Sequence, residues 1–201
     1  MGNGNGTSLT TGSNNFIIGY QNMRGTLGSD TNNVMIGFHN FREASYRSMS
    51  NVLIGSYNNY GAGDDNDYPE NNIGIGRSNL YHNQENYNVA IGFANVQNND
   101  YNNTGYNVGI GYECLKSVHR STYNVAIGYR ANHNTSGTST NNAKNISIGH
   151  QAMRFGEGQN HVAIGRDTLE NSHTDSIGNV AIGDSAMENS SSNLGSYCVC
   201  I

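Results

Sequence analysis

Histidine, cysteine and carboxylate side chains are the groups in this sequence that could bind a metal ion or take part in catalysis. None of the histidines lies beside a cysteine or a carboxylate at the spacing that zinc sites use. Cys198 and Cys200 are close together, but a zinc site takes about four ligands and no second pair exists. We therefore expect no metal and no cofactor. The seven histidines are His39, His82, His119, His133, His150, His161 and His173.

The run Asp64–Asp67, followed by Pro69 and Glu70, is the strongest acidic cluster. It lacks the alternating oxygen ligands and the closing glutamate of a calcium-binding loop. A solvated loop is the prediction for this segment, and weak calcium binding is the alternative.

Catalysis would require a nucleophile in a recognisable setting, or carboxylates stacked on consecutive repeats. Ser and Thr concentrate in turn-like segments, and no Ser-His-Asp arrangement stands out. The positions that follow the repeat glycines described below supply only Arg77, Arg166 and Asp184 as charged side chains. We expect a protein that is not an enzyme.

Composition excludes several other classes of protein. Only 35% of the 201 residues are apolar, against ~45–50% in soluble domains, whereas 26 are Gly and 35 are Asn. Such a chain cannot fill one thick core, so it must stay disordered or stack thin repeats. The net charge is −5 with no cluster of Lys or Arg, which argues against nucleic acid as a partner. No apolar stretch approaches 18 residues, so this segment should not insert into a membrane.

A repeat of about 18 residues dominates the sequence. Its signature is Asn, apolar residue, any residue, Ile, Gly. The Ile and Gly recur ten times, at Ile18, Ile36, Ile54, Ile75, Ile91, Ile110, Ile127, Ile148, Ile164 and Ile182, followed by Gly19, Gly37, Gly55, Gly76, Gly92, Gly111, Gly128, Gly149, Gly165 and Gly183. β-Branched residues spaced by two indicate a strand with one buried face, and we expect these isoleucines to form the core of the repeat. The Gly would allow a positive φ or a close backbone approach at a turn.

The Asn that opens the signature suits the corner where the chain enters the strand, because its amide can bond to nearby backbone. Stacked copies can also bond to one another, so an asparagine ladder is predicted. It comprises Asn15, Asn33, Asn51, Asn72, Asn88, Asn107, Asn124, Asn145 and Asn179, with His161 in the remaining copy.

A second apolar position lies four residues after the Gly. It should return to the same interior from a second short strand or corner. The residues are Met23, Phe41, Leu80, Val96, Leu115, Met153, Leu169 and Met187, with Asn59 and Asn132 as exceptions.

The residue between the two strand apolar positions is expected to face away from the interior. It is small or apolar in every copy: Ile17, Met35, Leu53, Gly74, Ala90, Gly109, Ala126, Ser147, Ala163 and Ala181. This composition predicts a second buried surface, either another side of a wide coil or the face of a neighbouring chain. A parallel homotrimer is favoured, and a monomeric two-sided solenoid is the alternative.

Several copies resemble known repeats, notably 88–96 (NVAIGFANV), 124–131 (NVAIGYRA) and 179–187 (NVAIGDSAM). They are similar to the β-roll head of trimeric autotransporter adhesins and to the repeat region of phage and phage-like tail fibres. The irregular spacing and the aromatic residue after several glycines favour the fibre family. Either resemblance implies a homotrimer that works in surface attachment.

The fold prediction is an all-β parallel solenoid of about ten rungs. Residues 1–13 form a Gly- and Asn-rich lead-in, and residues 14–201 form the array, which stops within an eleventh repeat. The expected function is a structural shaft segment of a trimeric virion or surface fibre involved in host attachment. The alternative is an adhesin head or extracellular filament subunit that binds glycan or matrix. The expected location is a virion surface or the extracellular space, with a surface glycan or receptor as a further partner.

Overall fold

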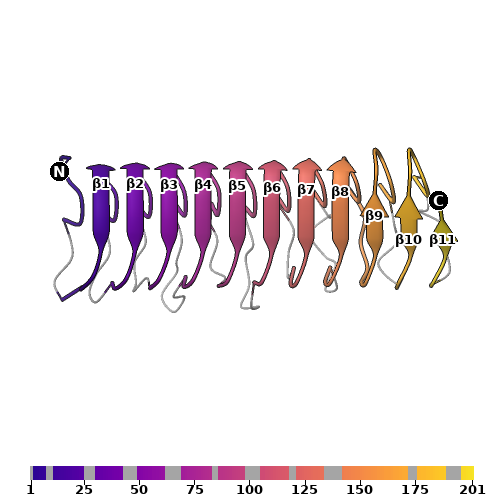
Figure 1. Ribbon diagram of the computed structural model, residues 1–201, viewed down its shortest axis with the longest axis horizontal. Coiled ribbons are helices and arrows are strands. Elements are labelled where there is room, and N and C mark those ends of the chain that lie inside the picture. Colours follow the sequence, from indigo (N-terminus) through magenta and orange to yellow (C-terminus); the bar gives the residue numbers. More distant parts are fainter. Residues whose placement is uncertain are drawn as a thin grey trace.

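The structure is a computed structural model in which the chain winds into a regular rod (Figure 1). The residues that it describes are 2–7, 11–24, 30–42, 49–61, 69–82, 86–97, 105–117, 121–133, 142–171, 176–188 and 196–201. The acidic run Asp64–Asp67 and two of the histidines, His119 and His173, lie outside these ranges.

Eleven strands form one parallel sheet in which each strand pairs with the next one along the chain (Figure 1). The prediction of an all-β parallel solenoid is confirmed, and strands β1 to β10 coincide with the ten copies of the signature. The strands are β1 (Phe16–Tyr20), β2 (Val34–Phe38), β3 (Val52–Ser56), β4 (Ile73–Arg77), β5 (Val89–Phe93), β6 (Val108–Tyr112), β7 (Val125–Tyr129), β8 (Ile146–His150), β9 (Val162–Ile164), β10 (Val180–Ile182) and β11 (Val199–Cys200).

Equivalent residues lie directly over one another along the rod. Ile18 pairs with Ile36, Ile36 with Ile54, and this in-register pairing continues to Ile164 and Ile182. The ten isoleucines therefore form one continuous file, as the repeat predicted. At ~4.8 Å per rung, the ten steps from β1 to β11 make a sheet about 50 Å long.

The two faces of the strands are reversed relative to the sequence interpretation. The middle residue of the signature points into the rod: Met35, Leu53, Ala90 and their equivalents are buried, and Ile17 alone is only partly so. The isoleucines that were expected to form the core point outward, and none of the ten is buried. Alternation separates the two faces of a strand, but it cannot say which face is inside when both are apolar.

Packing explains why the inward strand position is so often small. The residues four after each Gly fill the interior from the opposite side, and they include Phe41, Leu80, Val96 and Leu115, all fully buried. A Cβ added at Gly109 would lie 2.9 Å from Cγ2 of Val96. A large side chain on one wall therefore requires a small one on the other.

A polar layer divides the apolar interior into two parts. One cluster runs from Met23 to Ala131, and the other runs from Ala152 to Ala186. Between them Asn142 donates through Nδ2 to Oδ1 of Asn132 at 3.0 Å. The interior is thus not uniformly dry, in contrast to the continuous apolar core that the repeat implied.

Candidate interaction surface

The outward face of the sheet is a band of apolar side chains two files wide. We call it the outer strand face, and it consists of Phe16, Val34, Val52, Ile73, Val89, Val108, Val125, Ile146, Val162 and Val180 together with the ten repeat isoleucines. Within the part of the chain that the structure describes, no segment packs over it. Phe16 and Ile18, on the end strand, are 53% and 47% exposed. Their equivalents on inner strands are covered only by the rungs on either side.

Aromatic rings extend the outer strand face beyond the ends of the strands. Phe93, Tyr112, Tyr129 and His150 each follow a repeat Gly, and they stack with centroid separations of 5.1, 5.1 and 5.0 Å. The interplanar angles of 11–14° show that the rings are nearly parallel. The stacking follows from the register, because equivalent residues repeat at the spacing of neighbouring strands.

A second stack flanks the other end of strands β5 to β7. Tyr87, Tyr106 and Tyr123 immediately precede the ladder asparagines, and their centroids are 4.7 and 4.9 Å apart. Their side chains are exposed at the edges, whereas the face of each ring lies against the next ring. A sugar that needed an open ring face would find one only at the ends of such a stack.

The asparagines at the start of the signature form one file of hydrogen bonds. Each Oδ1 accepts from the backbone N–H of the equivalent residue on the next rung, at 2.9–3.1 Å from Asn15 through to Asn145. His161 substitutes through Nδ1, which accepts from Asn179 at 3.0 Å. The file gives the buried amides at the strand entrance a regular set of partners.

Sequence reasoning missed a second asparagine file at the strand exit, three residues after the Gly. Its members are Asn5, Asn22, Asn40, Asn58, Asn79 and Asn95. Each Nδ2 donates to the carbonyl of a repeat Gly on the next rung, as from Asn95 to Gly111 at 2.9 Å. Cys114 ends the file, and its Sγ lies 3.1 Å from the Gly128 carbonyl. The recurrence of Asn at this position was the available signal.

The repeat glycines stack so closely that no side chain fits. From Gly19 to Gly165, a Cβ would lie 1.8–2.2 Å from the carbonyl oxygen of the next Gly. All ten have φ between 120° and 138°, a range that L-residues rarely adopt. Close approach and positive φ thus both apply at this turn, and phosphate binding has no part in it.

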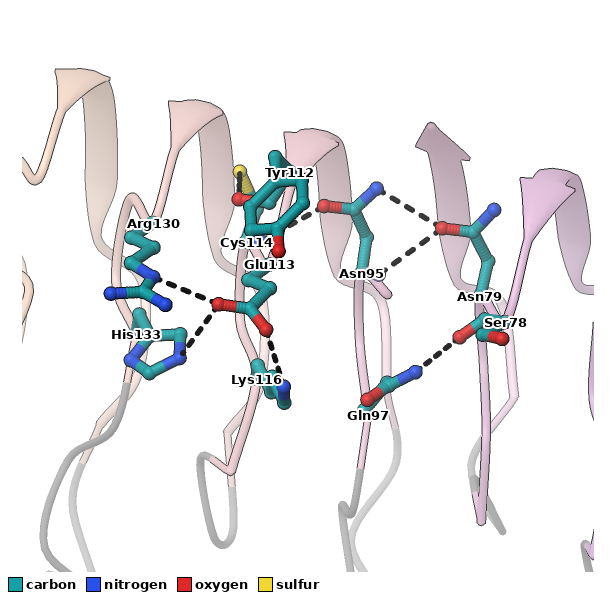
Figure 2. A network of polar contacts seen from close by, with 10 residues as sticks. All are labelled: Ser78, Asn79, Asn95, Gln97, Tyr112, Glu113, Cys114, Lys116, Arg130 and His133. Carbon is teal, nitrogen blue, oxygen red and sulfur yellow. Dashed lines mark hydrogen bonds and ion pairs between the residues drawn. The ribbon is translucent and has the colours of Figure 1, made fainter. Parts of the chain in front are cut away.

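Glu113 is the centre of a charged cluster on the flank of the rod (Figure 2). Its carboxylate accepts from Nζ of Lys116 at 2.5 Å and from Nε of Arg130 at 2.8 Å, and Nε2 of His133 lies 3.7 Å away. Burial raises the pKa of Glu113, but the bonds from Lys116 and Arg130 outweigh it and hold the pKa below its usual value. The cluster links two neighbouring rungs and contains no nucleophile.

The other residues considered for chemistry are dispersed along the rod. Burial lowers the pKa of His133 to about 4, and burial also lowers that of His161. Cys198 and Cys200 are partly buried free thiols, and Cys114 is a buried one. The described residues include no group of three or more His, Cys, Asp or Glu that could hold a metal ion.

Arg166 and Asp184, two of the charged residues that follow a Gly, do meet. Nη2 of Arg166 donates to Asp184 at 2.5 Å. Both side chains are largely exposed, so the pair contributes little to stability. Arg77 lies near Phe93, 6.0 Å from its ring centroid.

Across the described ranges, no helix has the length and hydropathy needed to cross a membrane. No protein-family model, curated protein or solved structure matches the chain.

Proposed function

We propose that the chain is a non-enzymatic shaft segment of a trimeric fibre at a virion or cell surface, involved in attachment to a host. The observation that carries this proposal is the outer strand face, which is apolar along the whole rod. Three copies would pack in parallel around a common axis through these faces.

The size of the face supports packing against other copies. Four residues of strand span ~13 Å, so a sheet ~50 Å long presents roughly 600 Å² of apolar surface before the aromatic stacks are added. Monomeric proteins rarely leave more than a few hundred Å² exposed in one patch. Because the surface repeats with the rungs, a parallel neighbour with the same pitch matches it at every step.

The argument for association has therefore moved to different residues. The small middle residues, such as Ala90 and Ala126, were expected to face a neighbouring chain, but they line the interior of the rod. Val and Ile on the outer strand face now take that role. The number three rests on the resemblance of the Asn-Val-Ala-Ile-Gly copies to trimeric fibre and adhesin repeats.

The alternative of a glycan-binding adhesin or filament subunit has less support. It depended on exposed tyrosines that could stack on sugars. Tyr106 stacks on Tyr87 and on Tyr123, so both of its ring faces are engaged. A glycan array probed with the assembled protein would detect this activity if the tyrosine edges and hydroxyls sufficed.

Light scattering combined with size-exclusion chromatography tests the association. The native protein should have three times the 21.7 kDa mass of one chain. Ile110→Lys with Ile127→Lys places two charges on the outer strand face and should yield a folded monomer. Asn160→Lys is the matched control, because Lys144 occupies the equivalent exposed position on the preceding rung. A native monomer at micromolar concentration would remove the proposal.

A further inference from the structure

Residues 2–6 have the structure of the second half of a rung. Gln21 N–H donates to the Asn3 carbonyl at 3.0 Å, as His39 N–H does to Tyr20. Asn5 Nδ2 donates to the Gly19 carbonyl at 2.7 Å, which is the bond that each exit asparagine makes. A Cβ on Gly2 would lie 1.5 Å from the Gly19 oxygen, so Gly2 occupies the place of a repeat Gly.

The first half of that rung is a cavity. It measures about 690 Å³ and is lined by Gly2, Asn5, Gly6, Gly12 and residues 14–18. These are the residues that a preceding strand would cover if the rung were complete. Asn15 N–H points to the place where every later ladder residue finds an acceptor, and no described residue accepts from it.

Strand β1 also offers hydrogen-bonding groups toward this cavity. Phe16 N–H donates to Asn33 on the β2 side at 2.8 Å. Successive N–H groups of a strand point to opposite edges, so Ile17 N–H points away from β2 and into the cavity. The edge is therefore an open template for one more parallel strand.

The other edge of the sheet has the complementary shape. β11 supplies Val199 and Cys200, which pair with Val180 and Ala181 and complete the first half of a rung. Beyond it, the turn after β10 is uncovered: a Cβ on Gly183 meets nothing closer than 4.0 Å, whereas the other repeat glycines each meet the next Gly. Residues 196–201 and residues 2–6 are thus two halves of the same repeat, at opposite ends of the rod.

We propose that the rod binds a second copy of this chain end to end, through insertion of residues 196–201 of one copy into the cavity at β1 of the next. The inserted strand pairs in parallel with β1, and residues 2–6 of the receiving copy cover the turn at Gly183. Small Cys200 occupies the inward position, and Val199 and Ile201 continue the outer strand face. Such a head-to-tail contact does not close on itself, so it produces filaments.

Electron microscopy of negatively stained protein over a range of concentrations tests the proposal. Rod lengths should increase in multiples of about 50 Å as the concentration rises. Ile17→Pro removes the N–H that points into the cavity and leaves the β1–β2 bonds, because proline is tolerated on an edge strand. It should weaken the end-to-end association constant about tenfold or more.

A variant of opposite sign guards against loss of folding as the explanation. Cys198 stands at the ladder position, and Cys198→Asn would supply an Oδ1 for the Asn15 N–H of the next copy. It should strengthen end-to-end association by about tenfold. Rods of one length at every concentration, or lengths that neither variant alters, would overturn the proposal. Ile110→Lys changes the width of the particle and leaves its length alone, so the trimer is tested separately.

Discussion

The backbone N–H of Asn179 donates to Nδ1 of His161 at 3.0 Å, in the one rung where the asparagine ladder carries another side chain. Nδ1 must therefore be unprotonated, and Nε2 carries the hydrogen toward Ser176 Oγ, 3.2 Å away. The ring is fully buried, and the only charged residue known to be in contact is Glu157, through its backbone.

Acid should weaken the protein through His161. Its folded pKa is lowered by burial, so the unfolded chain binds the proton more readily and stability falls as pH drops below about 6.5. One such group costs at most about 2 kcal/mol between pH 6.5 and 5. His161→Asn should retain the ladder and reduce this loss, as measured by urea unfolding at pH 7 and pH 5. His133 titrates in both proteins, so equal losses would contradict the role given to His161.

Asn59 is a buried defect whose removal should stabilise the rod. It occupies an interior position that is apolar in most rungs, and neither its Oδ1 nor its Nδ2 has a hydrogen-bond partner. Asn59→Leu should raise the free energy of unfolding by about 2 kcal/mol. Asn132→Leu is the matched control at the equivalent position. It should destabilise, because Asn142 would lose its partner.

The repeat glycines allow steric clash to be separated from backbone strain. Gly111→Ala combines a φ of 130° with a Cβ 2.0 Å from the Gly128 oxygen. Gly183→Ala has nearly the same φ, 128°, and an open space around the Cβ. The second variant should lose about 1–3 kcal/mol and remain folded. The first should fail to give a cooperative thermal transition, and similar behaviour of the two would show that clash is unimportant.

Cys114 should be the least reactive of the three thiols. Burial raises its pKa to about 11, whereas Cys198 and Cys200 are only partly buried. A thiol reagent at pH 8 should label two cysteines in the native protein and three in urea. Rapid labelling of all three in the folded state would contradict the position of Cys114.

Replacing Cys114 by Asn should extend the second asparagine file by one rung. The amide could donate to the Gly128 carbonyl, as Asn95 does to Gly111. An increase of about 1 kcal/mol in the free energy of unfolding is expected. A lower urea midpoint would show that the pocket around the thiol does not accommodate the amide.

The sequence was sufficient for the strands, their register and the turn glycines, because each rung repeats the same Ile-Gly step. It was not sufficient for the facing of the strand. Ala90 lies between Val89 and Ile91, and both faces of this strand are apolar, so alternation alone left the interior undetermined. The large residues four after the Gly, such as Leu80, decided the matter by filling the interior from the opposite wall.

The second asparagine file was hidden for another reason. Asn22 and Asn95 stand in a turn, where asparagine is common without any long-range role. Their bonds to the next rung depend on the stacking distance, which only three-dimensional placement reveals. The Glu113 cluster is similar, because Arg130 reaches it from a different rung.

The in-register pairing persists although the sequence distance between glycines changes. Gly55 to Gly76 spans 21 residues and Gly76 to Gly92 spans 16, yet Ile54, Ile75 and Ile91 remain aligned. Peptide epitopes inserted into the connections should thus be presented at a constant pitch along one flank. The molecule could serve as a graduated display platform, on which the separation between two grafted groups is chosen by counting repeats.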